Sequence, residues 1–117
     1  FQLLSGGEYM VSAGAIGATG AFSSLAAIAP KAVRSLYDLC RKDQLFEARS
    51  VQEEIAALLQ LLKKAGAVGL KASLRAMGRD CGDVRPPLRP LGEEESGRLS
   101  ETLAALPLIR MEPRGWQ

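Results

Sequence analysis

The chain contains no histidine and only two cysteines, and each shortage excludes a class of site. Without an imidazole there is no His-based general acid–base catalysis and no Ser–His triad, and most zinc sites lack a ligand. The cysteines, Cys40 and Cys81, are far apart in the sequence and form no CxxC pair. We therefore expect two reduced thiols, as in a cytoplasmic protein, with no disulfide, metal site or cofactor.

A strong charge imbalance is also missing, since the net charge is only +2. This is too small to indicate binding to nucleic acid or to an anionic membrane surface. The 117 residues, 47% of them hydrophobic, suffice for one small domain with a core. The chain starts at Phe1 and no basic segment with a cleavage site precedes an apolar run, so we expect no signal peptide and a chain that begins inside a longer one. We expect a cytoplasmic location, with the mitochondrial matrix as the alternative.

The stretch from Leu3 to Pro30 has a single charge, Glu8, and two interpretations. Because Tyr9–Pro30 is uncharged and about 20 such residues can cross a bilayer, one interpretation is a membrane span. The other is a strand–helix–strand unit of a parallel sheet that is buried on both faces. The stretch is rich in Gly, Ala and Ser and poor in the residues that drive membrane insertion, so we favour the second.

The expected strand–helix–strand unit begins with a strand at residues 1–5, which Gly6-Gly7 ends. A helix from Glu8 to Ile16 follows, and a second strand runs from Ala21 to Leu25. So short a unit predicts two parallel strands with a right-handed crossover.

The residues after Pro30 predict helices. Pro30 suits a first helical turn, and Asp43 could cap the next helix. Apolar residues then recur at three- and four-residue spacing, which predicts a helix that ends near Gly66. We expect further helices at 68–77 and 93–106, an extended loop with three prolines at 80–91, and a loosely ordered tail at 107–117.

Several motifs have both a functional and a structural interpretation, and we favour the structural one for each. Gly14, Gly17 and Gly20 give GxxGxxG, not the GxGxxG that binds a pyrophosphate, and so predict close packing. Lys31 and Lys71 could be reactive amines but are expected to be solvated. The loop around Pro86-Pro87 could be an SH3-type ligand, although a rigid loop packed on its own domain is favoured.

Four segments in order resemble the C-terminal portion of the dihydrodipicolinate synthase/N-acetylneuraminate lyase family: LLSGGE, GATGAFSSLAAIAP, LYDLCRKDQLFEA and GLKASLRAMGRDCGDVRPPLRPL. The resemblance extends to about Leu106. It implies an α/β fold, namely a C-terminal fragment of a (β/α)8 TIM barrel with a helical extension, mostly α by residue count. Residues 1–30 would hold the last two parallel strands, with Leu3–Ser5 the seventh and Ala21–Leu25 the eighth. Residues 31–106 would form the last barrel helix and the extension.

The resemblance also implies substrate-binding residues. Gly6 and Glu8 match the glycine-acidic turn after the seventh strand. Phe22 is similar to the residue of the eighth strand whose backbone contacts pyruvate, and Ser24 is similar to the serine that binds substrate in the neuraminate lyases. The sequence departs from the family at Gly7, where Asp is frequent, and at Ala27, where Asn is common.

The implied activity is that of a class I lyase, a pyruvate-dependent aldolase or synthase that forms a Schiff base with pyruvate or another 2-oxo acid. The family's reactive lysine lies on the sixth strand, and a barrel of this type needs about 250 residues. We therefore expect this fragment to be inactive alone, with no catalytic residue of its own, and the complete protein to be a homo-oligomer. A non-catalytic helical interaction module is the alternative.

Overall fold

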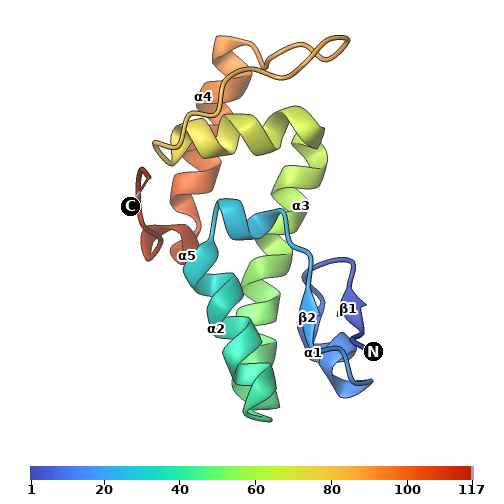
Figure 1. Ribbon diagram of the computed structural model, residues 1–117. Helices are drawn as coiled ribbons and strands as arrows, with labels where there is room; N and C mark the ends of the chain where they lie inside the picture. The colour runs from blue at the N-terminus through green and yellow to red at the C-terminus, as the bar shows by residue number, and fades with distance from the viewer. Residues whose placement is uncertain (117) are drawn as a thin grey trace. The chain divides into compact units, whose positions relative to one another are not determined.

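A computed structural model describes residues 1–116, which form two compact units, one of Phe1–Ala57 and one that begins at Leu58 (Figure 1). The sequence predicted a division after residue 30, between the end of a barrel and a helical part. The boundary between the two compact units lies within a helix, and the division after residue 30 stays a prediction.

Two short parallel strands, β1 (Leu4–Ser5) and β2 (Gly20–Ala21), begin the first unit. They pair in the register Leu4↔Gly20 and Ser5↔Ala21, which confirms the predicted parallel pair. Helix α1 (Met10–Ala15) connects them and is shorter than the predicted helix.

The second strand ends earlier than the sequence predicted. Leu25 was assigned to that strand, but it begins the 3-10 helix η1 (Leu25–Ala27). The cause lies at Ser24, whose φ of −69° and ψ of −26° are helical and cannot continue a strand. This turn places the Leu25 side chain in the core, where it is fully buried.

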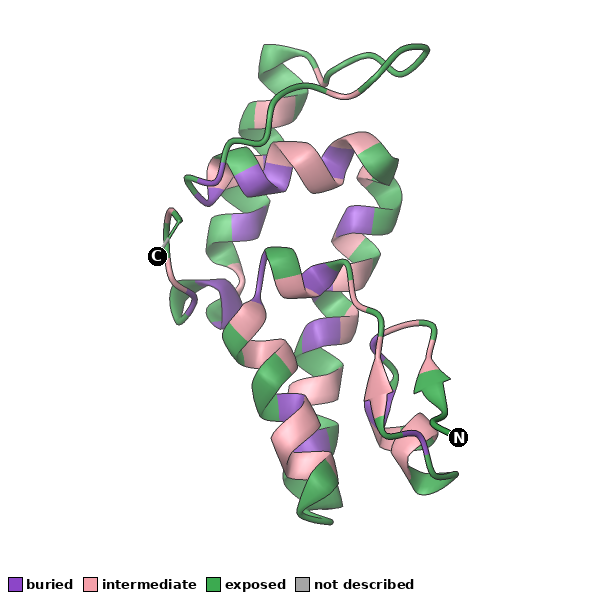
Figure 2. Cartoon of the chain, in the orientation of Figure 1, coloured by how far each residue is buried: buried purple, intermediate pink, exposed green. Residues whose placement is uncertain are grey.

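Helix α2 (Pro30–Arg41) begins at the predicted proline, whose fixed φ suits a first helical turn. After α2, Asp43 does not cap the next helix as predicted but has a φ of +57°, a conformation in which Asp is several-fold enriched. The chain reverses there, and the amide of Gln44 donates to the carbonyl of Leu39 (3.0 Å). The fully or nearly buried apolar residues of this unit (Figure 2) come from the α1–β2 region, η1, α2 and the start of α3: Met10, Ala18, Leu25, Ile28, Ala29, Leu36, Ala48 and Ile55.

Helix α3 (Leu45–Ala76) is long but interrupted at Gly66, which has a φ of 65° and a ψ of −163°. Only glycine adopts this backbone conformation readily. The predicted helix end at Gly66 is thus confirmed as a break between two helical segments.

The second unit contains the segment of α3 from Leu58, then α4 (Glu93–Ala105) and α5 (Pro107–Arg110). Its core is again apolar and comes from all three helices and from Met77: Leu58, Leu62, Leu74, Met77, Leu99, Leu103, Leu108 and Ile109. Glu93, Glu94 and Glu95 occupy the first turn of α4, where the helix dipole favours carboxylates, and Glu95 Oε2 accepts the amide of Gly92 (3.3 Å).

The tail from 107, which the sequence predicted to be loosely ordered, contains the short helix α5 and several buried residues. Leu108 and Ile109 are buried on α5, and Arg79 holds the segment that follows. Arg79 is 6% exposed, and its guanidinium donates to the carbonyls of Gly115 (2.9 Å) and Pro113. These contacts join residues more than thirty positions apart, which a local reading of the sequence does not capture. Gln117 lies outside the described residues.

The membrane interpretation of Tyr9–Pro30 is not supported. Within residues 1–116, no helix combines the length and the apolar character that crossing a bilayer requires. The stretch instead divides into α1, β2 and η1, which are separate short elements.

Candidate functional site

Two turns at the carboxyl ends of β1 and β2 form the candidate site. The first turn carries Gly6 and Glu8, and the second carries Phe22 and Ser24. Because the strands are parallel, both turns leave the same edge of the sheet. The amide of Phe22 donates to the carbonyl of Ser5 (2.9 Å), which extends the pairing to the start of the second turn.

The carboxylate of Glu8 joins the two turns. Glu8 is only 6% exposed, and its Oε1 accepts hydrogen bonds from Ser23 Oγ (2.8 Å) and from the amide of Leu25 (3.4 Å). Ser23 Oγ in turn accepts the amide of Ala26 (3.3 Å), at the start of η1. A buried carboxylate needs such donors, since burial without them costs several kcal/mol.

The backbone around Glu8 is held from helix α3. Gln52 Nε2 donates to the carbonyl of Glu8 (2.7 Å), and the amide of Val11 donates to Gln52 Oε1 (3.4 Å). The side chain of Gln52 therefore forms hydrogen bonds with one backbone carbonyl and one backbone amide at the junction of the first turn and α1.

The four predicted site residues lie at one edge of the sheet but differ in exposure. Phe22 is 72% exposed, and Gly6 and Ser24 are also exposed, so a small molecule could reach them. Glu8 is buried and hydrogen-bonded to the protein. Its side chain is thus directed at the neighbouring turn.

Sequence reasoning missed Ser23 and Gln52. For Gln52 a signal was present, because it lies four residues after Ala48 and three before Ile55, both fully buried. A polar residue on the apolar face of a helix must find a polar partner. For Ser23 no local signal distinguishes it from its neighbour Ser24.

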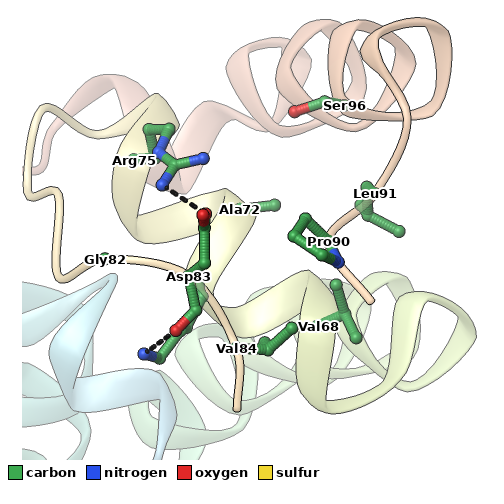
Figure 3. A pocket seen from close by; sticks show the side chains of 10 residues that line it. Val68, Ala72, Arg75, Gly82, Asp83, Val84, Pro90, Leu91 and Ser96 are labelled. Carbon is green, nitrogen blue, oxygen red and sulfur yellow. Dashed lines mark hydrogen bonds and ion pairs between the residues drawn. The ribbon is translucent and has the colours of Figure 1, made fainter. Parts of the chain in front are cut away.

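Within the second unit, hydrogen bonds and ion pairs connect the loop at 80–91 to α3 (Figure 3). Lys71, which was expected to be solvated, is half-buried, and its Nζ donates hydrogen bonds to the carbonyls of Asp83 (2.7 Å) and Cys81 (3.3 Å). The Arg75 guanidinium pairs with Asp83 (3.0 Å) and Asp80 (3.2 Å). The cavity between them has a volume of about 30 Å³, which is room for a single water.

These ion pairs shift two protonation equilibria. The amide of Gly82 and, next, the guanidinium of Arg75 lower the pKa of Asp80. Hydrogen bonds from Arg75 to Asp83 and then to Asp80 raise the pKa of Arg75. The contacts hold the loop against α3.

Among residues 1–116, no three His, Cys, Asp or Glu side chains cluster as the ligands of a metal ion would. Cys40 and Cys81 are both free thiols. Partial burial raises the pKa of the Cys40 thiol, which disfavours the reactive thiolate.

Comparison with known proteins gives one consistent result. The model of the dihydrodipicolinate synthetase family matches residues 1–106. An uncharacterized DapA-like lyase of Halobacterium salinarum is 32% identical over 108 residues, which are 91% of this chain and 36% of that protein. The 4-hydroxy-tetrahydrodipicolinate synthase of Corynebacterium diphtheriae is 35% identical over 81 residues, or 68% of this chain and 27% of that protein.

Solved structures agree with these sequence matches. A crystal structure of dihydrodipicolinate synthase superposes with a TM-score of 0.78 at 27% identity, over 93% of this chain and 38% of that one. The synthase of Aquifex aeolicus gives a TM-score of 0.77 at 24% identity, over 92% and 38%, and supports the fold alone. The chain thus spans little more than a third of the length of these TIM-barrel proteins.

Proposed function

The chain belongs to the dihydrodipicolinate synthetase family, a family of lyases, and on this premise we propose that the complete protein is a class I aldolase or synthase. In such an enzyme a lysine amine condenses with the carbonyl of pyruvate or another 2-oxo acid and releases water. The resulting imine withdraws electrons from the neighbouring carbon while a carbon–carbon bond is made or broken. In this proposal residues 1–30 are the end of the (β/α)8 barrel, and residues 31–106 are its last helix and the C-terminal extension.

One observation carries the proposal: two turns with exposed residues, Gly6 on one and Phe22 and Ser24 on the other, leave the carboxyl ends of adjacent parallel strands. Active sites of TIM barrels are built at this edge. The backbones of Gly6 and Phe22 and the hydroxyl of Ser24 would contact the 2-oxo acid. Because the Phe22 amide already donates to the Ser5 carbonyl, the contact of Phe22 would not involve that amide. Glu8 was also expected to contact the substrate, but its carboxylate is already occupied by Ser23 and Leu25.

The reactive lysine is proposed to lie outside these 117 residues. Residues 1–30 contain no lysine, and the first one, Lys31, follows the proline that opens α2. The chain would thus contribute to substrate binding without supplying the nucleophile, and would be inactive alone. The complete protein would act on a small molecule in the cytoplasm as a homo-oligomer, without cofactor, nucleic acid or membrane.

Borohydride trapping with labelled pyruvate tests this function, because borohydride reduces an imine to a stable amine. The complete protein should be labelled when pyruvate and borohydride are both present, and the isolated 117-residue chain should not. Omission of borohydride is the control. A complete protein that no 2-oxo acid labels would contradict the proposal and favour the non-catalytic helical module.

A further inference from the structure

Glu8 is the only charged residue among the first 30, and it is buried. The proposed chemistry gives its carboxylate no role. The carboxylate accepts hydrogen bonds from Ser23 Oγ and from the Leu25 amide, which both belong to the turn after β2, a different segment of the chain. Its hydrogen bonds therefore determine where that turn lies.

We infer that Glu8 is a positioning residue, which fixes the turn after β2 so that Phe22 and Ser24 face the 2-oxo acid. The inference rests on the proposed function for the identity of the substrate. It differs from the sequence prediction, because Glu8 acts here through the turn and does not touch the substrate.

Hydrogen bonds hold the chain at and beside the two residues proposed to face the substrate, Phe22 and Ser24. The Phe22 amide is fixed by the carbonyl of Ser5 (2.9 Å), and the Leu25 amide is fixed by Glu8 Oε1 (3.4 Å). Ser23, between Phe22 and Ser24, is held by the same oxygen at 2.8 Å. The backbone of Ser24 is thus constrained on both sides while its own side chain stays exposed.

Gln52 extends this arrangement to helix α3. Its side chain accepts a hydrogen bond from the Val11 amide and donates one to the Glu8 carbonyl, so the backbone of Glu8 is also held in place. A series of hydrogen bonds therefore runs from α3 through Glu8 to the turn after β2. The helical segment that follows the strands contributes in this way to the geometry of the binding edge.

Substitution of Glu8 in the complete protein separates positioning from direct contact. Both donors reach the same oxygen, Oε1, so Glu8→Gln keeps an acceptor for Ser23 and Leu25 but removes the charge. Glu8→Ala removes the acceptor. We expect Glu8→Ala to raise KM for pyruvate about tenfold and to lower kcat less than about threefold, with KM restored in Glu8→Gln.

Two further variants complete the comparison. Ser23→Ala removes one of the two donors and should raise KM about threefold, which keeps a test available if Glu8→Ala does not fold. Glu53→Ala removes an exposed carboxylate one residue after Gln52 and should leave both constants unchanged. A Glu8→Gln protein as impaired as Glu8→Ala would show that the charge itself is required and would overturn the inference. Unchanged KM in Glu8→Ala and Ser23→Ala would also overturn it.

Amide hydrogen exchange distinguishes this inference from the proposed function. In the complete protein, the peptide that contains Phe22–Ile28 should exchange about tenfold faster in Glu8→Ala than in wild type or Glu8→Gln. If the wild type neither labels with nor turns over a 2-oxo acid, the proposed function fails, but the exchange measurement still tests whether Glu8 fixes the turn. Equal exchange in Glu8→Ala and wild type would reject that role.

Discussion

Replacement of Arg79 by methionine should release the segment after α5. The methionine keeps most of the aliphatic volume of the side chain but loses the charged donors to Gly115 and Pro113. Each hydrogen bond from a charged group contributes about 1.5–3 kcal/mol, and the freed carbonyls can partly regain water. We therefore expect a net loss of about 2–4 kcal/mol, a large part of the stability of a small domain.

Trypsin reports this change directly, because Arg114 is a cleavage site within the held segment. Its guanidinium donates to the Ala76 carbonyl (2.9 Å), and the amide of Gly115 donates to the Met77 carbonyl (2.9 Å). Since each 1.4 kcal/mol changes an equilibrium tenfold, cleavage after Arg114 should accelerate about thirtyfold or more.

The matched control is Arg98→Met, which removes an arginine whose guanidinium pairs with Glu94 on α4. Both of those side chains are more than 70% exposed, so the pair contributes little and cleavage after Arg114 should not change. Equal cleavage rates in Arg79→Met and wild type would refute the reasoning that burial makes the Arg79 contacts strong.

Three further predictions concern the second unit. In urea titrations, Gly66→Ala should lower the free energy of unfolding by about 1–2 kcal/mol, because a φ of 65° strains any residue with a side chain. Gly97 lies inside α4 with open space around it, so Gly97→Ala should raise the free energy of unfolding by about 0.5–1 kcal/mol. The pKa of Asp80 is lowered in the folded state, so its stabilisation is present above the unfolded value of about 3.9 and is lost as the pH falls through the lower folded value. The protection factor of the Gly82 amide, which is the exchange rate corrected for the slower intrinsic exchange in acid, should fall over that range, and Asp80→Asn should abolish the dependence. Ser73→Ala should raise the free energy of unfolding, measured by urea titration, by about 1 kcal/mol, because the buried Ser73 Oγ has no hydrogen-bond partner among residues 1–116. A lower free energy of unfolding in this variant would show that the hydroxyl forms a hydrogen bond in the wild type.

The parts of the fold that the sequence predicted depend on local backbone chemistry. Pro30 opens a helix because its φ is fixed, and Gly66 interrupts one because it tolerates a positive φ. The parallel orientation of the two strands followed from short apolar runs separated by a short helix, whereas their register and the inclusion of Gly20 did not.

The parts that sequence reasoning missed depend on contacts between distant residues. The apolar run through Leu25 is compatible with a strand or a helical turn, and the Glu8 carboxylate, seventeen residues away, stabilises the turn. Likewise the C-terminal segment is hydrogen-bonded to Arg79, thirty-six residues before Gly115. The position of the candidate site at the strand ends was predictable, but the burial of Glu8 was not.

Peptide mapping of the trapped adduct tests the central claim most directly. After the complete protein reacts with pyruvate and borohydride, the modified lysine should lie in a peptide outside these 117 residues. An adduct on one of the five lysines of this chain, Lys31, Lys42, Lys63, Lys64 or Lys71, would contradict the account.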